Sequence, residues 1–372
     1  MHRLIAVVAE GRPAFVDQLR RVWDAGDAVF PLDPRLPAPA AEALLGVLAP
    51  SALVDTEGEA HPRAGSRPVD DGDALVVATS GTSGSPRGVV LTHEAVRAAA
   101  LATSAALAVD PEQDRWLACL PLAHVGGLSV ITRALATSTP LIVLPRVDAV
   151  AIEAEVRRGA TLVSLVASTL ARVDTAWFRR ILIGGSAPPK RRPANVVATY
   201  GMTETGGGVV YDARPLAGVE VRAVDGELQL RGSMLLRCYR DGLDPKDPDG
   251  WLATGDAGSV ASDGAVAVQG RLAEVIVTGG EKVWPAPVEA VLVTHPAVVD
   301  VGVVGRPDPE WGQRVVAVVV PVDPARPPTL AGLRSWAKEH LPAYAAPREL
   351  VLVDHLPRTA LGKLRRSALS PR

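Results

Sequence analysis

Residues 74–88 have the sequence ALVVATSGTSGSPRG, in which a short apolar strand leads into a loop of glycines and hydroxyl residues. Small side chains let backbone N–H groups approach phosphate oxygens, hydroxyl groups add donors, and Arg87 adds a planar cation that can bind one phosphate through two N–H groups. The loop contains neither GxxxxGKS/T nor GxGxxG, so it is neither a Walker loop nor a dinucleotide-binding turn. We predict that it binds the polyphosphate of a nucleotide, and a flexible Gly/Ser turn is the alternative interpretation. The residues concerned are Thr79, Ser80, Gly81, Thr82, Ser83, Gly84 and Arg87.

On both sides of this loop, short apolar runs alternate with amphipathic or alanine-rich stretches. The pairs are Leu4–Ala9 with Pro13–Ala25, Ala74–Ala78 with Thr92–Leu107, Leu117–Leu120 with Leu128–Ala136, and Leu141–Leu144 with Ala149–Arg158. Strands that read as continuous apolar runs are typical of a sheet covered on both faces by crossover helices. The sequence therefore predicts an α/β fold with a largely parallel sheet.

After about Tyr211 the sequence pattern changes from alternating strands and helices to short strands separated by turns. Asp-Gly turns at 225, 241, 249 and 263 separate short apolar runs, which predicts an antiparallel β section. From Arg271 onward a new α+β unit is predicted, with a helix opened by Pro285 and Pro287, strands at 298–304 and 315–322, and a helix near 330–340. We therefore predict a large N-terminal domain, residues 1–270, and a small mobile C-terminal domain, residues 271–372, with a boundary near Gly270.

Composition excludes several classes of function. The 372 residues carry 39 Lys and Arg against 41 Asp and Glu, so the net charge of −2 gives no global field for nucleic acid or an anionic membrane. Cys119 and Cys238 stand alone, which predicts buried thiols rather than a disulfide or zinc site. We find no signal-peptide core and no apolar run of membrane-spanning length, and we expect a cytoplasmic protein.

Seven motifs occur in the order found in the adenylate-forming superfamily, which contains acyl- and aryl-CoA ligases, luciferases and the adenylation domains of peptide synthetases. Besides the loop at 79–88, they are LPLAHVGG at 120–127, IGGSAP at 183–188, YGMTE at 200–204, GWLATGD at 250–256, GRLAE at 270–274 and PRTALGK at 357–363. Together these ordered matches are highly specific, whereas each alone is weak. The chain resembles this superfamily over most of its length.

The resemblance implies an ATP-dependent activation of a carboxylic acid, with ATP, Mg²⁺ and coenzyme A as cofactors. It assigns catalytic roles to Lys363, Thr203, Glu204 and His124, with Glu204 as the metal ligand. It assigns the adenine turn to Gly184, Gly185 and Ser186, the adenine face to Tyr200, the ribose to Asp256, with Arg271 supporting ribose or phosphate, and the CoA channel to Gly279 and Gly280. Taken singly, each has an ordinary structural interpretation, such as a solvated lysine, a helix start or a turn.

The sequence departs from the family pattern at several positions. Arg87 stands where lysine is usual and Ser83 where threonine is usual, so charge and hydroxyl are kept. Ala123 replaces an aromatic residue and implies a reshaped acyl pocket. Only 78 residues precede the phosphate loop, which predicts a trimmed first subdomain, although residues 29–37 still resemble a family segment. Ala273 occupies the expected hinge position between the two domains.

Within the superfamily the chain resembles the o-succinylbenzoate-CoA ligases of menaquinone biosynthesis. The segments that carry this resemblance are 164–170, 200–211, 278–280 and 312–316. Their substrate has two carboxylates, and only the one on the succinyl tail is adenylated. Arg133 is the candidate partner of the other carboxylate, because it lies in the apolar stretch 128–135 where an uncompensated guanidinium is costly. His124, Ser168, Gly206 and Gly207 complete the predicted acid site.

Alternatives remain open at this point. Arg133 could extend to solvent from a half-buried helix, and a tight turn explains the glycines almost as well. The chain could be another acyl- or aryl-CoA ligase, a stand-alone adenylation enzyme or a non-catalytic adenylate-binding relative. The joint presence of Lys363, Thr203, Glu204 and Asp256 argues against the last of these. A small-molecule acid is the expected partner, and a homo-oligomer is possible.

Overall fold

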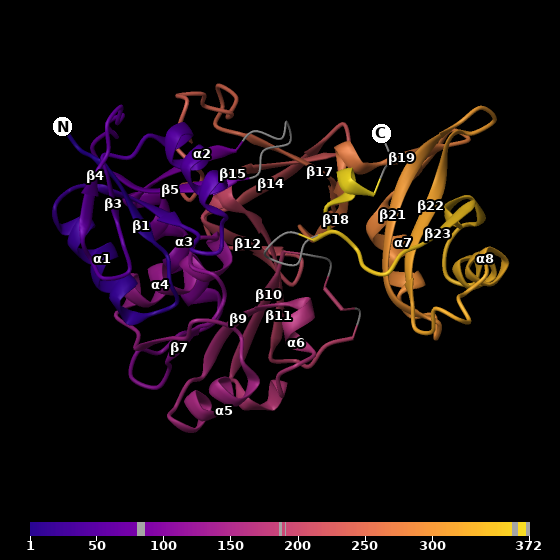
Figure 1. Ribbon diagram of the computed structural model, residues 1–372, viewed down its shortest axis with the longest axis horizontal. Coiled ribbons are helices and arrows are strands. Elements are labelled where there is room, and N and C mark those ends of the chain that lie inside the picture. Colours follow the sequence, from indigo (N-terminus) through magenta and orange to yellow (C-terminus); the bar gives the residue numbers. More distant parts are fainter. Residues whose placement is uncertain (80–85, 186–187, 190, 359–363, 370–372) are drawn as a thin grey trace. The chain divides into compact units, whose positions relative to one another are not determined.

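The computed structural model describes residues 1–79, 86–185, 188–189, 191–358 and 364–369. The chain divides into two compact units, which Figure 1 colours mainly from indigo to rose and from orange to yellow. The first unit comprises Met1–Val221, Leu230–Leu252 and Asp263–Ala265, and the second comprises Arg222–Gln229, Ala253–Ser262 and Val266–Arg372. The second unit thus includes strands on the N-terminal side of Gly270, and the predicted boundary at that residue stays a prediction.

The first sheet of the first unit has the strand order β16-β6-β5-β2-β1-β3-β4. Its strands are β1 (Leu4–Val8), β2 (Ala28–Leu32), β3 (Ala52–Val54), β4 (Ala60–Pro62), β5 (Asp73–Thr79), β6 (Arg87–Thr92) and β16 (Cys238–Tyr239), and its helices are α1 (Pro13–Asp24), α2 (Ala38–Leu48) and α3 (His93–Ala106). Strands β1, β2, β3 and β5 run parallel, whereas β4, β6 and β16 pair antiparallel with their neighbours. The predicted parallel core is confirmed, but the sheet as a whole is mixed.

Apolar spacing explains the helices of this layer. Pro13 occupies the first turn of α1, where its missing N–H is not needed, and Phe15, Val16, Leu19 and Val22 form one buried face. The Thr92 side chain caps α3 by accepting a hydrogen bond from the Ala95 N–H at 3.1 Å. Because β6 ends at Thr92, the cap directs the chain from strand to helix with no intervening loop.

The second sheet of the first unit has the order β13-β12-β11-β10-β9-β7-β8. Its strands are β7 (Trp116–Ala118), β8 (Leu141–Val143), β9 (Leu162–Val166), β10 (Arg180–Gly184), β11 (Val196–Met202), β12 (Gly207–Tyr211) and β13 (Arg214–Pro215); its helices are α4 (Val125–Thr137), α5 (Ala149–Arg157) and α6 (Ala167–Leu170), with short 3₁₀ turns η1 (Thr175–Trp177) and η2 (Thr203–Thr205). Strands β7 to β11 run parallel, and β12 and β13 add antiparallel pairs. The carboxyl ends of the parallel strands therefore share one edge, which is where open α/β sheets usually bind ligands.

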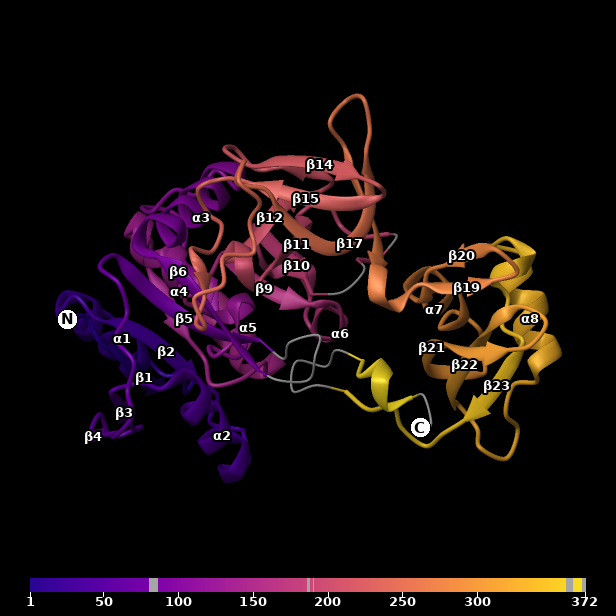
Figure 2. The same ribbon diagram turned by 90° about the horizontal axis from the view of Figure 1, so that it is seen from above.

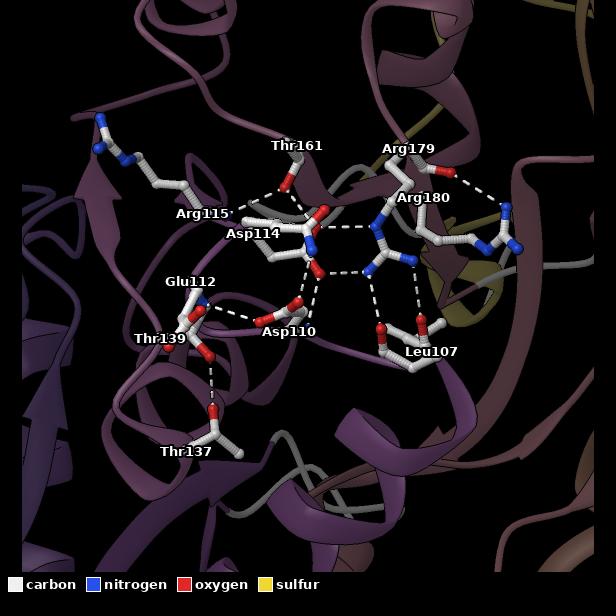
Figure 3. A network of polar contacts seen from close by, with 12 residues as sticks. Leu107, Asp110, Glu112, Asp114, Arg115, Thr137, Thr139, Thr161, Arg179 and Arg180 are labelled. Atoms are coloured by element: carbon white, nitrogen blue, oxygen red, sulfur yellow. Dashed lines mark hydrogen bonds and ion pairs between the residues drawn. The ribbon is translucent and has the colours of Figure 1, made fainter.

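A buried carboxylate fixes the opposite, amino-terminal edge of this sheet (Figure 3). Asp114 accepts hydrogen bonds from Arg179 Nε at 2.8 Å, Arg179 Nη2 at 2.5 Å and the Thr161 hydroxyl at 2.8 Å. Arg179 also donates to the Leu107 carbonyl at 3.0 Å, just after α3 ends. Since Asp114, Thr161 and Arg179 each precede a strand by one or two residues, the network ties three strand starts to one helix end.

The second unit contains two sheets; Figure 2 labels β14, β15 and β17 of one and β19 to β23 of the other. The four-stranded sheet has the order β14-β15-β17-β18, with β14 (Glu220–Val224), β15 (Glu227–Arg231), β17 (Leu252–Val260) and β18 (Val266–Arg271). The five-stranded sheet has the order β20-β19-β22-β21, and β23 pairs with β22. Its elements are η3 (Leu272–Glu274), β19 (Ile276–Thr278), β20 (Glu281–Val283), α7 (Pro285–Leu292), β21 (Val298–Asp308), β22 (Gly312–Pro321), α8 (Leu330–Lys338), η4 (Ala343–Ala345), β23 (Glu349–Leu352) and η5 (Arg366–Ala368).

The α+β prediction for the C-terminal part is confirmed. Helices α7 and α8 contribute Val288, Leu292, Leu333 and Ala337 to one apolar core, which also contains inward residues of β19, β21 and β22. Antiparallel pairing of β17 with β18 bears out the predicted β section. Both cysteines are buried, as expected. Among the described residues, no helix has the length and apolar character needed to cross a membrane.

Candidate active site

The described part of the phosphate loop is the base of a β-hairpin. Strand β5 ends at Thr79, β6 begins at Arg87, and these two residues are direct partners in the antiparallel ladder. A Cβ atom at Gly88 would lie 2.6 Å from Leu48 Cδ2 and 2.8 Å from Val76 Cγ1, so any side chain at this position would require its neighbours to shift. The predicted residues Ser80, Gly81, Thr82, Ser83 and Gly84 lie outside the described residues.

Glu204 lies buried in η2, directly after β11. The Thr205 hydroxyl accepts a hydrogen bond from the Met202 N–H at 3.0 Å and donates to the Gly207 carbonyl at 2.6 Å, which fixes the turn around Glu204. Thr203, in the same turn, is half-buried. The structure therefore places the predicted Thr-Glu pair at the carboxyl edge of the second sheet.

Tyr239 connects this carboxylate to the base of the phosphate loop. Its hydroxyl donates a hydrogen bond to Glu204 Oε1 at 3.0 Å, and the Arg87 guanidinium carbon lies 5.1 Å from the centroid of its ring. Burial, followed by the charge of Glu204, raises the pKa of Tyr239 to about 12, so the hydroxyl remains a donor at neutral pH. Tyr239 was not predicted from the sequence, because a lone tyrosine in a two-residue strand carries no periodic or motif signal.

The predicted adenine turn lies at the carboxyl end of β10. A Cβ atom at Gly184 would lie 2.6 Å from Thr199 Oγ1, and Gly185 has φ of +81°, a left-handed conformation that favours glycine. Tyr200 follows Thr199 on the neighbouring strand β11. Gly184, Gly185 and Tyr200 are thus brought to one edge, while Ser186 lies outside the described residues.

His124 caps the N-terminus of α4 by its backbone conformation. Its Nε2 lies 3.4 Å from Asp33 Oδ2, and Arg35 binds the same carboxylate through Nε at 2.8 Å and Nη2 at 2.6 Å. Burial opposes ionisation of Asp33, but the Arg35 hydrogen bonds and charge outweigh it and hold the pKa of Asp33 below its ordinary value. Burial also lowers the pKa of His124, against the opposing charge of Asp33, which favours a neutral imidazole.

Arg133 is buried, with 5% of its surface exposed, so the alternative in which it extends to solvent is wrong. Its Nη2 donates to the Ser129 hydroxyl at 3.0 Å and its Nη1 to the Ser164 hydroxyl at 3.3 Å. Its guanidinium carbon lies 5.5 Å from the ring centroid of Trp116. Burial lowers the pKa of Arg133, and within the described part of the chain no carboxylate forms an ion pair with it.

Of the two predicted glycines, Gly207 adjoins this buried cation. A Cβ atom at Gly207 would lie 3.4 Å from Arg133 Nη2 and 3.5 Å from Ser129 Cβ, and the Gly207 φ of +149° is unfavourable for other residues. Gly206 ends η2 with φ of +64°. The backbone conformation of the turn therefore favours glycine at both positions, and Gly207 lies within van der Waals contact distance of Arg133. The side chain of Ser168 lies outside the described part of the structure.

Two hollows of the first unit differ in their relation to these residues. A cavity of about 10 Å³ borders Gly206 and Ser129, and a pocket of about 430 Å³ lies between α1 and the segment from Ala134 to Val143. The larger pocket contains none of the predicted site residues. The chemistry-bearing side chains, rather than pocket size, therefore define the candidate site.

Asp256 and Arg271 are cross-strand partners in the second unit. Arg271 Nε lies 3.0 Å from Asp256 Oδ1, and its Nη1 donates to the Thr254 carbonyl at 2.9 Å. The Asp256 backbone N–H donates to the Thr254 hydroxyl at 3.1 Å, so the carboxylate is held at a fixed place in β17. The two residues that the sequence assigned to ribose and phosphate thus form one ion pair.

Gly279 and Gly280 form the turn between β19 and β20, with φ of +59° and +83°. Such a two-residue hairpin turn, with positive φ at both residues, favours glycine whatever its function. A Cβ atom at Gly279 would also lie 2.8 Å from the Trp311 ring, so a bulky substitution would disturb this turn directly.

The lysine-bearing segment is described only at its two ends. Lys363 lies outside the described residues. After it, Arg366 donates to Glu274 Oε2 at 2.8 Å and to Glu289 Oε2 at 2.6 Å. Glu274 follows the predicted hinge residue Ala273 in η3.

Comparison with known families and proteins is consistent with this arrangement. Residues 60–239 match the AMP-binding enzyme family and residues 287–363 match the AMP-binding enzyme C-terminal domain. A probable 2-succinylbenzoate–CoA ligase of Mycobacterium tuberculosis is 42% identical over 330 residues, covering 81% of this chain and 85% of the relative. A 2-succinylbenzoate–CoA ligase of Bacillus cytotoxicus is 33% identical over 335 residues, covering 79% and 69%.

Solved structures share the fold. The o-succinylbenzoate CoA synthetase of Bacillus subtilis, in complex with its acyl-adenylate intermediate, superimposes with a TM-score of 0.81 at 26% identity and covers 100% of this chain and 88% of its own. ATP-bound MatB from Rhodopseudomonas palustris superimposes with a TM-score of 0.86 at 22% identity, covering 99% and 88%.

Proposed function

The chain belongs to the AMP-binding enzyme family of adenylate-forming CoA ligases, and we propose that it converts 2-succinylbenzoate, ATP and CoA into 2-succinylbenzoyl-CoA, AMP and diphosphate. In the first step, an oxygen of the succinyl carboxylate bonds to the α-phosphorus of ATP and the bond to the β-phosphate oxygen breaks. In the second step, the CoA sulfur bonds to the acyl carbon, AMP leaves with the carboxylate oxygen, and the thiol proton passes to solvent. We also propose that the reaction takes place in the cytoplasm, where both ATP and CoA are available.

The surroundings of Arg133 are the observation that favours 2-succinylbenzoate as the acid substrate. A buried guanidinium is costly unless an anion compensates it, and its described partners are two neutral hydroxyls and an aromatic ring. The benzoate carboxylate would supply the missing negative charge in the planar, two-oxygen form that arginine binds best. The neutral form of His124 favoured by burial would add no second cation beside the acid.

Adenylation brings two anions together, so the remaining residues are assigned to charge and position. We assign Thr203 and Lys363 to the α-phosphate, Arg87 and Thr79 to the polyphosphate, and Asp256 with Arg271 to the ribose. Tyr200, Gly184 and Gly185 form the proposed adenine site, and Gly279 and Gly280 the proposed CoA side, in a C-terminal domain that begins near Gly270.

Glu204 fits the requirement of a Mg²⁺ ligand. Mg²⁺ prefers carboxylate oxygens, and Glu204 is a buried carboxylate whose Oε1 accepts the Tyr239 hydrogen bond. Among the described residues, no hydrogen bond reaches its other oxygen. A bound Mg²⁺ would neutralise charge on the phosphates, and Glu204 would fix where that charge is placed.

The proposal is tested by comparing two enzymes on two acids. The unaltered enzyme and Arg133→Lys are assayed for pyrophosphate release and thioester formation with 2-succinylbenzoate and with 4-oxo-4-phenylbutanoate, which lacks the ring carboxylate. We expect the unaltered enzyme to prefer 2-succinylbenzoate and Arg133→Lys to lose roughly 1 to 3 kcal/mol of that preference, since an ammonium keeps the charge but not the planar fork.

Arg179→Lys is the matched control, because it makes the same exchange at the amino-terminal edge of the same sheet. It should affect both acids equally. If the unaltered enzyme treats both acids alike and Arg133→Lys does the same, Arg133 is structural and the chain is an acyl- or aryl-CoA ligase of another acid.

A further inference from the structure

Tyr239 occupies a position that the proposed roles leave unexplained. It is the second residue of the two-residue strand β16, and its ring lies between Arg87 at the base of the phosphate loop and the buried carboxylate of Glu204. Arg87, Glu204 and Tyr239 come from three separate segments of the chain. Tyr239 contacts both of the others.

The backbone around Tyr239 is held on both sides. Tyr239 pairs with Val89 of β6, its N–H donates to the Leu243 carbonyl at 2.8 Å, and the Gly242 N–H donates back to the Tyr239 carbonyl at 2.8 Å. This closes a tight turn directly after β16. The ring therefore projects from a fixed point two residues along β6 from Arg87.

The neighbouring Arg240 adds a second anchor. Its guanidinium donates to three backbone carbonyls, those of Leu48 at 3.0 Å, Pro68 at 2.7 Å and Arg67 at 2.5 Å. Its N–H donates to the Gly88 carbonyl at 2.7 Å. These hydrogen bonds fix Arg240, the residue after β16, to the backbone of two other segments. The position of β16 is therefore strongly determined.

We propose that Tyr239 is a positioning residue for adenylation, whose hydroxyl orients the Glu204 carboxylate toward the cation and whose ring seats Arg87 at the base of the phosphate loop. The inference rests on the proposed role of Glu204 as the metal ligand. A hydrogen bond to Oε1 limits rotation of the carboxylate and directs its other oxygen away from Tyr239. An arginine over an aromatic face is held without losing its ability to donate to phosphate.

The two parts of Tyr239 can be separated by substitution. Tyr239→Phe removes the hydroxyl and keeps the ring, so it should raise the Mg²⁺ concentration for half-maximal pyrophosphate exchange by about ten-fold and leave the KM for ATP within about two-fold. Tyr239→Leu removes both parts, so it should raise the KM for ATP as well. Binding of Mn²⁺ with ATP in the absence of acid, measured by electron paramagnetic resonance, should weaken about ten-fold in Tyr239→Phe without any turnover.

Tyr211→Phe is the matched control. Tyr211 is also buried in the first unit, and its hydroxyl forms a hydrogen bond with the Thr103 hydroxyl at 3.0 Å rather than with Glu204. Its loss should leave the cation dependence unchanged. Thermal unfolding of both variants shows whether either substitution damages the fold.

The Glu204→Gln background distinguishes positioning from general damage. If Tyr239 acts through Glu204, adding Tyr239→Phe to Glu204→Gln should change the cation dependence by less than about two-fold. If Tyr239→Phe keeps the normal cation dependence while Glu204→Gln loses it, the role of Tyr239 is overturned and the metal role of Glu204 stands. Equal effects of Tyr239→Phe in both backgrounds would also overturn the role of Tyr239. An unchanged cation requirement in Glu204→Gln would instead overturn the metal role of Glu204.

Discussion

Arg179 and Arg133 both lie against the second sheet of the first unit, but their surroundings differ. Arg179 donates to Asp114, to the Leu107 carbonyl and to the Ala108 carbonyl, so its charge is compensated within the protein (Figure 3). Arg133 is more deeply buried and donates to the hydroxyls of Ser129 and Ser164. Among the described residues it forms no ion pair.

The difference separates a charge that stabilises the fold from a charge that we propose binds the substrate carboxylate. Breaking a buried ion pair is costly, because it leaves one uncompensated charge, whereas an unpaired buried cation already weakens the fold. The first arrangement lies at the amino-terminal edge, where strands begin and no site residue is predicted. The second lies beside Gly207, at the strand that follows the Thr-Glu pair.

The largest effect is expected from breaking the compensated pair. Asp114→Ala removes the acceptor of four hydrogen bonds and leaves Arg179 without its carboxylate. Because Arg179 is partly exposed, the loss falls at the low end of the range for buried pairs, about 3 kcal/mol of unfolding free energy. Urea denaturation measures it.

Asp263→Ala serves as the control for that measurement. It removes an ion pair with Arg214 in which both side chains are more than half exposed, so it should cost less than about 1 kcal/mol. Equal effects of the two substitutions would contradict the role given to the Asp114 network.

A smaller effect of different kind is expected at Arg133. Arg133→Met replaces the guanidinium by an apolar chain of similar length, so the unfolding free energy without substrate should change by no more than about 1 kcal/mol. Binding of the acid should weaken by about 2 kcal/mol, since a charged hydrogen bond to the ring carboxylate is lost. Denaturation and calorimetric titration of the same preparation give both values. A loss of stability as large as that of Asp114→Ala would make Arg133 structural.

Local patterns predicted the elements well. The first strand, expected at 4–9, is β1 at Leu4–Val8, and the helix expected near 330–340 is α8 at Leu330–Lys338. Apolar periodicity and caps act within a few residues of each other, so a single sequence contains that information.

Contacts between residues that are far apart in the sequence could not be predicted in the same way. Tyr239 and Glu204 are 35 residues apart, and Asp33 and His124 are still further apart. Nothing in the spacing of single polar residues shows which of them will meet across two strands. Arg133 could be predicted as a candidate because a charged residue stands in an apolar stretch of a helix. That pattern is visible locally, and it indicates that a partner from elsewhere must compensate the charge.

The smallest expected effect is the pH dependence of the stability that the Asp114–Arg179 pair contributes. Burial raises the pKa of Asp114, but the Arg179 hydrogen bonds and charge, with those of Asp110 and Thr161, outweigh it and leave the pKa below its ordinary value of 3.8. A depressed carboxyl pKa contributes stability above the unfolded pKa, and this contribution is lost as pH falls through the folded pKa.

The stability advantage of the unaltered protein over Asp114→Asn should therefore be constant from pH 7 to about 5 and shrink below about pH 4, by an amount on the order of 1 kcal/mol. Other lowered carboxyls, such as Asp33, are present in both proteins and cancel in the difference. Arg133→Met is the control, because arginine does not titrate in this range, so its difference from the unaltered protein should stay flat. Urea denaturation at half-unit steps of pH measures both curves. A difference for Asp114→Asn that stays constant below pH 4 would show that the charge of Asp114 is not what Arg179 stabilises.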